Sequence, residues 1–155
     1  MPSTPVTQAL EALGVPHRLH VHASEARSLA QVACERGLAP EQVVRSLLFR
    51  LEGGEFILVL AGGPARISWP RLRRYLGVSR ITTASRSEVL EVTGYEPGAV
   101  SPYGLPRKLR GFADRGLQAH DTLSVGAGIR NAGVLLARRD LERTLSLEYG
   151  DFTDA

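Results

Sequence analysis

Residues 94–106 read GYEPGAVSPYGLP, and almost half of these positions are glycine or proline. Proline lacks a backbone N–H donor and glycine is entropically costly in regular structure, so the run is excluded from a helix interior and disfavoured in a central strand. We expect a turn-rich loop with a short strand-like core at residues 99–101. Gly98 allows a positive φ or a close approach, and Pro102 holds Ser101 in an extended conformation.

A loop of this kind presents backbone N–H groups from a stiff frame that is fixed at both ends. Preorganised N–H groups can stabilise an anion or a developing oxyanion without the help of charged side chains. The same composition is also typical of an ordinary connecting loop, and the residues of the stretch alone favour that simpler interpretation.

The length and composition of the chain are those of one globular domain. It has 155 residues, of which 43% are hydrophobic and 23% charged. This length predicts a single domain over residues 1–155 with a sufficient core. Cys34 is the single cysteine, which excludes an intrachain disulfide and a multi-cysteine metal site. No secretory leader and no apolar run of membrane length stand out, so we expect a cytoplasmic protein without a membrane partner.

The pattern of apolar residues and helix caps predicts a mixture of helices and strands. The clearest feature is a hairpin formed by the apolar runs at residues 46–51 and 56–60. Helices are predicted over residues 4–13, 28–36, 68–76, from Ser85 onwards and over 141–147; further strands are predicted at 17–22, 110–113, 119–123 and 133–136. The fold class is therefore α/β, a single compact domain with a mixed, mainly antiparallel sheet and flanking helices.

The charge is mildly basic, which is compatible with a nucleic-acid partner but does not demonstrate one. The formal net charge is +3, and Lys108 is the one lysine among 19 basic residues. Arg71 and Arg74 lie three residues apart, so they share one face of a predicted helix. They and the Arg107–Lys108 pair are candidate tRNA phosphate contacts, and a solvated face in an arginine-rich protein is an equal alternative.

Two other groups of residues suggest binding chemistry only weakly. His17, His20 and His22 lack a cysteine or carboxylate at metal-ligand spacing, so we predict a solvated strand edge and no metal. His22 ends that strand and is the histidine that can face a pocket. The run from Gly126 to Gly133 resembles a phosphate loop only loosely, and a glycine-rich turn that lines a cleft beside residues 94–106 is at least as consistent with it.

Arg45 is a charge within an apolar strand, in the stretch VVRSLL at residues 43–48. A charge in such a position must be paired or must face a cleft. An arginine that extends along the strand edge into solvent is the alternative, and we favour the cleft.

Four segments together resemble a known family. They are residues 41–48 (EQVVRSLL), 93–104 (TGYEPGAVSPYG), 111–114 (GFAD) and 124–141 (SVGAGIRNAGVLLARRDL). In this order they are similar to the YbaK-type aminoacyl-tRNA deacylase family, which includes the editing domain inserted in many bacterial prolyl-tRNA synthetases. Residues Gly98 to Pro102 match the G-x-x-x-P signature of that family, and the resemblance covers nearly the whole chain.

The resemblance implies hydrolysis of the ester between a wrong amino acid and the 3′ end of tRNA, with no metal or other cofactor. Water would be the nucleophile. The loop formed by Gly98, Ala99, Val100, Ser101 and Pro102 would hold the aminoacyl end and act on its carbonyl oxygen. The family lines its pocket at the positions of His22, Ser46, Asp114, Gly126 and Gly128. Small amino acids such as alanine, cysteine or serine on tRNA-Pro would be the substrates, and prolyl-tRNA synthetase a partner.

Arg45 departs from the resemblance because the family has a characteristic functional lysine at this position. Arginine stays protonated, so it cannot replace a lysine that transfers a proton, but it can hold a terminal phosphate or ribose. Two hypotheses follow. The chain is a freestanding trans-editing deacylase in which Arg45 clamps the substrate, or it is an inactive module that binds a tRNA end or a synthetase. An Arg45 that faces Gly98 favours the first hypothesis, and one held in an internal contact favours the second.

Overall fold

The computed structural model describes residues 3–25 and 28–154. Within these ranges the α-helices are α1 (Pro5–Ala12), α2 (Leu29–Arg36), α3 (Trp69–Leu76), α4 (Arg86–Thr93) and α5 (Arg138–Thr144). The strands are β1 (Arg18–Val21), β2 (Val44–Leu51), β3 (Phe56–Gly62), β4 (Ile81–Thr83), β5 (Arg110–Asp114), β6 (Thr122–Gly126), β7 (Ala132–Ala137) and β8 (Leu147–Gly150). Short 3-10 helices occupy Pro40–Gln42 and Arg115–Ala119. None of the helices in these ranges is long and apolar enough to cross a bilayer.

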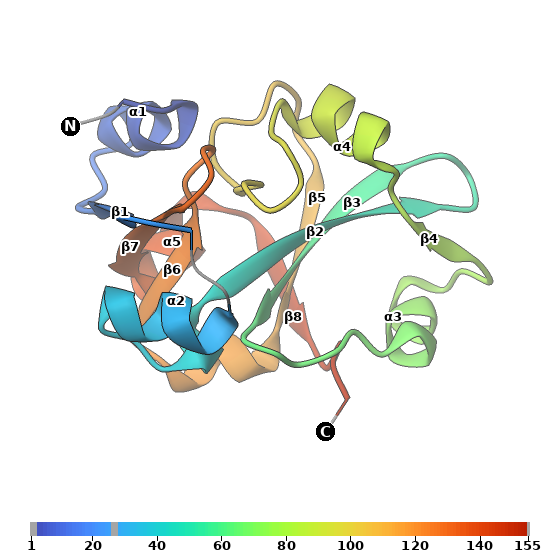
Figure 1. The fold of residues 1–155 in the computed structure, drawn as a ribbon. Helices are drawn as coiled ribbons and strands as arrows, with labels where there is room; N and C mark the ends of the chain where they lie inside the picture. The colour runs from blue at the N-terminus through green and yellow to red at the C-terminus, as the bar shows by residue number, and fades with distance from the viewer. Residues whose placement is uncertain (1–2, 26–27, 155) are drawn as a thin grey trace.

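The strands form two sheets that share one domain (Figure 1). The larger sheet has the order β4-β2-β3-β5-β8, in which β5 runs parallel to both of its neighbours and the other pairs are antiparallel. The smaller sheet, β1-β7-β6, is antiparallel throughout. A single parallel bridge between Val43 and Ser124 connects the two sheets. The predicted α/β class with mainly antiparallel pairing is confirmed, and the β-structure is divided between two sheets.

The helix starts follow the predicted caps. The hydroxyls of Ser28, Ser68 and Ser85 each accept a hydrogen bond from the backbone N–H three residues later. These bonds satisfy N–H groups that the first helical turn leaves free. Gly37 ends α2 in the left-handed conformation, with φ of 75°. The sequence therefore determines these helices locally.

Two predicted elements near the C-terminus were wrong. The last helix begins at Arg138 and ends at Thr144, and Leu147 instead opens β8, which pairs in parallel with β5. The strand expected at residues 119–123 begins only at Thr122, because Arg115–Ala119 winds into a 3-10 helix after Asp114. In both places long-range pairing or local capping overrides the apolar pattern.

Strand β2 separates two hydrophobic cores. Val44 and Leu48 point into the larger core, whereas Phe49 and Leu51 point into the smaller core on the opposite face. Successive side chains of a strand alternate between faces. Ser46 therefore shares the face of Val44 and Leu48.

The glycine- and proline-rich stretch is a loop, as predicted, and none of its residues 94–106 belongs to a strand. The expected strand-like core at residues 99–101 is instead held by packing and isolated hydrogen bonds. The buried Tyr95 hydroxyl donates to the Tyr103 carbonyl oxygen at 2.6 Å, which closes the loop on itself. The Gly128 N–H donates to the Ala99 carbonyl oxygen at 3.1 Å, which ties the loop to the turn after β6.

Gly126 is needed where this turn meets the loop. A Cβ at this position would lie 2.0 Å from the Val100 carbonyl oxygen. Such a contact with backbone forces either the loop or β6 to move. The close packing between the loop and the smaller sheet, called the seam, therefore requires a residue without a side chain at position 126.

We expect Gly126→Ala to lower the free energy of unfolding by about 1–3 kcal/mol, the usual cost of overpacking a filled interior. Urea unfolding followed by circular dichroism measures this change. Gly53→Ala is the matched control, because nothing lies within 4 Å of a Cβ at Gly53. If Gly126→Ala unfolds at the same urea concentration as Gly53→Ala, the seam is not tightly packed.

Candidate active site

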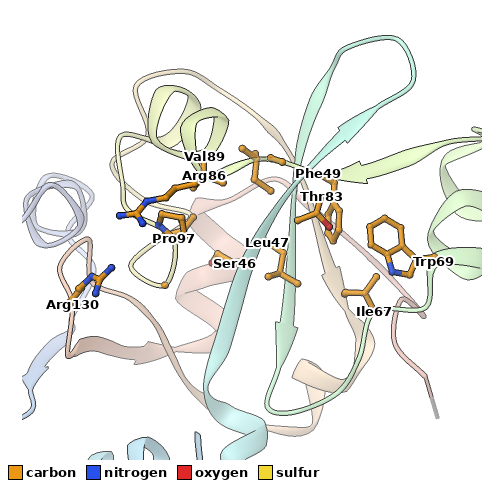
Figure 2. A pocket seen from close by; sticks show the side chains of 14 residues that line it. Ser46, Leu47, Phe49, Ile67, Trp69, Thr83, Arg86, Val89, Pro97 and Arg130 are labelled. Carbon is orange, nitrogen blue, oxygen red and sulfur yellow. The ribbon is translucent and has the colours of Figure 1, made fainter. Parts of the chain in front are cut away.

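Two adjoining cavities meet at the edge of β2. The first, called the polar cavity, has a volume of about 420 Å³. It lies between α2, β2, the loop of residues 94–106 (the Gly98 loop) and the turn between β6 and β7. The second, called the apolar cavity, has a volume of about 540 Å³ and is lined largely by apolar side chains, including Leu47, Phe49, Ile67, Trp69, Val89 and Pro97 (Figure 2). Ser46, Leu47, Gly98 and Val100 belong to the walls of both. The two cavities thus form one site with a polar and an apolar half.

Most of the predicted site residues are brought together in the polar cavity. Its wall contains His22, Arg45, Ser46, Gly98, Val100 and Gly126. These residues come from the position directly after β1, from β2, from the 94–106 loop and from β6, so only the tertiary structure makes them neighbours. The proposed glycine-rich turn beside the loop is confirmed, because Gly126 contacts the loop backbone directly.

The remaining predicted residues lie behind this wall or elsewhere. Ala99 and Ser101 are buried within the loop. Pro102 lines a different cavity together with Tyr103 and Lys108, and a Cβ at Gly128 would meet the ring of Tyr95. The loop therefore offers Pro97, Gly98 and Val100 to the site, and its other residues support them.

Asp114 is outside the walls of both cavities, contrary to its expected place in the pocket. One carboxylate oxygen accepts the N–H of Phe152 at 2.9 Å, and the other accepts the N–H of Gly116 at 3.0 Å. Phe152 is fully buried against the smaller core. The carboxylate of Asp114 thus anchors the C-terminal segment and caps a 3-10 helix, which occupies both of its oxygens.

Ser46 lies on an unpaired edge of β2 and lines both cavities. Strand β4 pairs only with Phe49–Leu51, so the edge of β2 at Ser46 has no neighbouring strand in the register. Figure 2 shows Ser46 and Leu47 on opposite sides of the strand. The Ser46 hydroxyl is buried and finds no hydrogen-bond partner among the described residues. A buried hydroxyl without a partner is unusual, and here it marks a place for a ligand or water atom.

Arg45 lines the polar cavity, but its guanidinium is engaged elsewhere. The alternation of β2 places it on the face opposite Ser46, where one terminal nitrogen donates to the Ala65 carbonyl oxygen. Its Nε is buried and has no hydrogen-bond partner in the part of the chain that the structure describes, and burial lowers the pKa of this guanidinium. The expected contact of Arg45 with the Gly98 side is thus replaced by an internal hydrogen bond, which is the arrangement associated with the binding-only hypothesis.

A buried network beside Ser46 includes a residue that the sequence analysis did not select. Arg36, at the end of α2, donates from Nε to His22 Nε2 at 3.1 Å and from Nη1 to Ser124 Oγ at 2.9 Å. His22 Nδ1 lies 3.3 Å from a carboxylate oxygen of Glu35. Arg36 and His22 are 9% and 6% exposed, so His22 faces the pocket, which was the alternative expected for this histidine, and not a solvated strand edge. An arginine in the last turn of a helix is an ordinary feature of helix ends, so the sequence pattern did not indicate that Arg36 belongs to the site.

The network fixes the protonation of His22. Its Nε2 accepts a hydrogen bond from Arg36, so the neutral ring carries its proton on Nδ1, toward Glu35. Burial lowers the pKa of His22, and the neighbouring Arg36 cation lowers it further. His22 therefore orients Arg36. Neither ring nitrogen can accept a proton from water, because Nε2 accepts from Arg36 and Nδ1, which has no hydrogen-bond partner among the described residues, carries the proton. No group of three or more metal-binding side chains occurs among the described residues.

Comparison with known proteins places this site in a family. Residues 23–144 match the model of the aminoacyl-tRNA editing domain. The chain belongs to this family. The match contains both β2 and the Gly98 loop, and thus the cavity wall except His22, which lies directly before the matched residues.

Individual relatives agree with this assignment. The chain is 33% identical over 121 residues to the proline–tRNA ligase of Bacillus licheniformis, covering 78% of this chain but 21% of that enzyme. It is 33% identical over 114 residues to the uncharacterized protein YwhH of Bacillus subtilis, covering 74% and 72% of the two chains. A solved structure of a proposed trans-editing enzyme for prolyl-tRNA synthetase matches with a TM-score of 0.90 at 25% identity, over 97% of this chain and 96% of that one.

We expect stability to depend on pH through His22. The folded state lowers its pKa below the ordinary value of 6.5, so the unfolded chain binds the proton more readily. The free energy of unfolding contributed by this group is fully present above pH 6.5 and is lost as the pH falls through the folded pKa. Urea unfolding at a series of pH values, for wild type and His22→Gln, measures this pH-dependent contribution to the free energy of unfolding.

In this experiment His22→Gln should flatten the loss of stability below pH 6.5, because the amide oxygen can still accept from Arg36 but does not titrate. His120→Gln, at a half-buried histidine outside the network, is the control and should keep the wild-type slope. Equal slopes for His22→Gln and wild type would show that His22 does not carry this dependence.

Proposed function

We propose that this member of the aminoacyl-tRNA editing family is a freestanding trans-editing hydrolase that removes a small amino acid, such as alanine, cysteine or serine, from mischarged tRNA-Pro. The observation that carries the proposal is the buried, unpartnered Ser46 hydroxyl facing a cavity that the Gly98 loop also lines. The similarity to a proposed trans-editing enzyme over nearly the full length of both chains supports it.

The site can supply what ester hydrolysis requires. Water attacks the ester carbonyl carbon and the carbonyl oxygen becomes negatively charged. The bond to the ribose oxygen then breaks, and a proton from the attacking water passes to that oxygen, which releases the amino acid and the tRNA hydroxyl. Fixed N–H and O–H donors stabilise that negative charge without reorganising. Ser46 and the loop backbone at Gly98 are the candidate donors, and the bonds of Tyr95 and Gly128 hold the loop in place.

Arg45 has a limited part in this proposal. Its contact with the Ala65 carbonyl uses one of five guanidinium N–H groups, so other N–H groups remain for a ribose or phosphate at the cavity. Because the guanidinium remains protonated, Arg45 would hold the substrate and would not transfer a proton. Discrimination between amino acids would rest on the size of the cavity, as in other editing sites.

A binding module without hydrolysis is the second candidate function. The internal hydrogen bond of Arg45 supports it, since the cation that the family resemblance assigns to substrate is directed to the chain itself. Such a module would hold the tRNA end, or dock on prolyl-tRNA synthetase, through the same cavity.

Deacylation of tRNA-Pro carrying alanine, cysteine, serine or proline distinguishes the two functions. We expect wild type to release one of the small mischarged amino acids and to leave prolyl-tRNA intact. Ser46→Ala should lower kcat/KM roughly 100-fold, the lower end of the range for loss of one oxyanion donor. Arg45→Ala should mainly raise KM, and Arg45→Lys should stay close to wild type.

Other outcomes would support different conclusions. Wild type that is inert on all four esters but binds uncharged tRNA supports the binding module. Activity gained only by Arg45→Lys shows that this chain has lost the reaction at that position. Cleavage of prolyl-tRNA as fast as the mischarged forms contradicts an editing role.

The exposed arginines of α3 are proposed to contact tRNA phosphates. Arg71 and Arg74 are both exposed, although one Arg71 nitrogen donates to the Thr153 carbonyl at 2.8 Å. Replacing both by Gln should weaken tRNA binding and reduce the slope of log K against log salt by about 1–2. The matched control replaces Arg18 and Arg139, two exposed arginines outside α3 that are not proposed to contact tRNA, by Gln. Binding by the α3 variant that equals wild type across the salt series rejects this surface.

A further inference from the structure

We propose that Arg36 is the fixed cation of the polar cavity and that it binds a phosphate group of the ligand, namely the phosphodiester preceding the terminal adenosine of tRNA. The choice of this phosphate rests on the proposed function. The existence of a phosphate site at Arg36 rests only on the geometry of the cavity.

The guanidinium of Arg36 is held rigidly from several sides. His22 at the end of β1 accepts from its Nε, and Ser124 on β6 accepts from its Nη1. On β7, Gly133 leaves space for it, since a Cβ there would lie 2.3 Å from Nη1. The residue after β1 and two strands of the smaller sheet, β6 and β7, thus hold one side chain of α2 in place.

No carboxylate pairs directly with Arg36 within the described part of the chain; burial lowers the pKa of Arg36, and only the more distant Glu35 carboxylate acts against this effect. Both of its hydrogen-bond acceptors are neutral, and none of the ion pairs between described residues includes it. The neighbouring Glu35 carboxylate lies instead against the other nitrogen of His22. A buried cation is costly unless it is paired, and a bound anion would provide the partner.

Arg36 is also directed to the correct side of the site. It lines the same polar cavity as Ser46 and Gly98. Arg45 approaches this cavity from the opposite face of β2 and contacts Ala65. A guanidinium is suited to phosphate because its planar N–H groups match the phosphate oxygens.

The same wall offers a place for the positive end of an aminoacyl ester. Glu25 lines the polar cavity and is exposed, so its carboxylate remains near solvent at the mouth. A ligand with one phosphate and one ammonium group, such as the aminoacylated end of tRNA, would find a charge of opposite sign for each. This match favours the tRNA end over a free phosphate ion.

The test compares binding of adenosine 5′-monophosphate, adenosine and inorganic phosphate to the full chain. Trp69 lines the adjoining apolar cavity and is the single tryptophan of the chain, so its fluorescence, supported by calorimetry, can report binding. We expect wild type to bind adenosine 5′-monophosphate more tightly than either adenosine or phosphate alone. Arg36→Gln should weaken the nucleotide roughly 10- to 100-fold and leave adenosine unchanged, as expected for a lost charge-assisted hydrogen bond.

Controls separate binding from folding. Arg139→Gln removes an exposed arginine outside both cavities and should bind like wild type. Ser124→Ala keeps the charge but removes one anchor, so it should weaken the nucleotide several-fold, and it serves as the second variant if Arg36→Gln does not fold. Arg36→Lys should fall between Gln and wild type because it keeps the charge without the planar fork.

Three results overturn the proposal. The first is that wild type does not bind the nucleotide better than adenosine. The second is that Arg36→Gln folds and keeps its nucleotide affinity. The third is that Arg36→Gln loses affinity equally for the nucleotide and for adenosine. If wild type binds inorganic phosphate as tightly as the nucleotide, Arg36 binds a free anion and the assignment to tRNA is overturned. If the nucleotide binds through Arg36 but no mischarged tRNA is cleaved, the phosphate site stands and the deacylase proposal fails. If mischarged tRNA is cleaved and Arg36→Gln does not change the KM, the deacylase proposal stands and the phosphate site at Arg36 fails.

Discussion

The partial pairing of β2 is the constraint on which the rest of the site depends. On one edge the strand is paired with β3 along nearly its whole length, whereas on the other edge β4 covers only Phe49–Leu51. The strand also separates two cores, which fixes the face of every side chain. Ser46 is therefore held in position by flanking core residues while its own edge stays open. A binding site needs both properties, rigid placement and an unsatisfied group, and β2 provides them in one element.

The Gly98 loop completes the site because it has almost no freedom to move away. Tyr95, the contact of Gly126 with Val100, and the bond from Gly128 to Ala99 hold it against the smaller sheet. The energetic cost of ordering a glycine- and proline-rich segment is thus met by packing during folding and not by the ligand during binding. Such preorganisation is what makes backbone donors effective toward a developing charge.

The two arginines of the site illustrate how placement decides chemistry. Arg45 is a candidate site residue in the sequence because its charge interrupts an apolar strand, yet its guanidinium donates a hydrogen bond to the backbone carbonyl of Ala65. The sequence pattern did not single out Arg36, which lies at a helix end, yet Arg36 is the buried cation that has neutral hydrogen-bond partners in the polar cavity. Composition and spacing identify charged residues, but the face of a strand and the packing of a helix determine which of them meets a ligand.

The sequence by itself determined the elements whose signals are local. Serine caps set the starts of α2, α3 and α4, alternating apolar runs set the β2–β3 hairpin, and the glycines and prolines of residues 94–106 set a loop. The segments that resemble the editing family also indicated most of the cavity wall. Only the tertiary structure decided the strand β8, the engagement of Asp114 with Phe152 and Gly116, and the seat of Arg36. Each of these depends on contacts between residues far apart in the chain, and no local propensity encodes which distant groups will satisfy a buried charge or a strand edge.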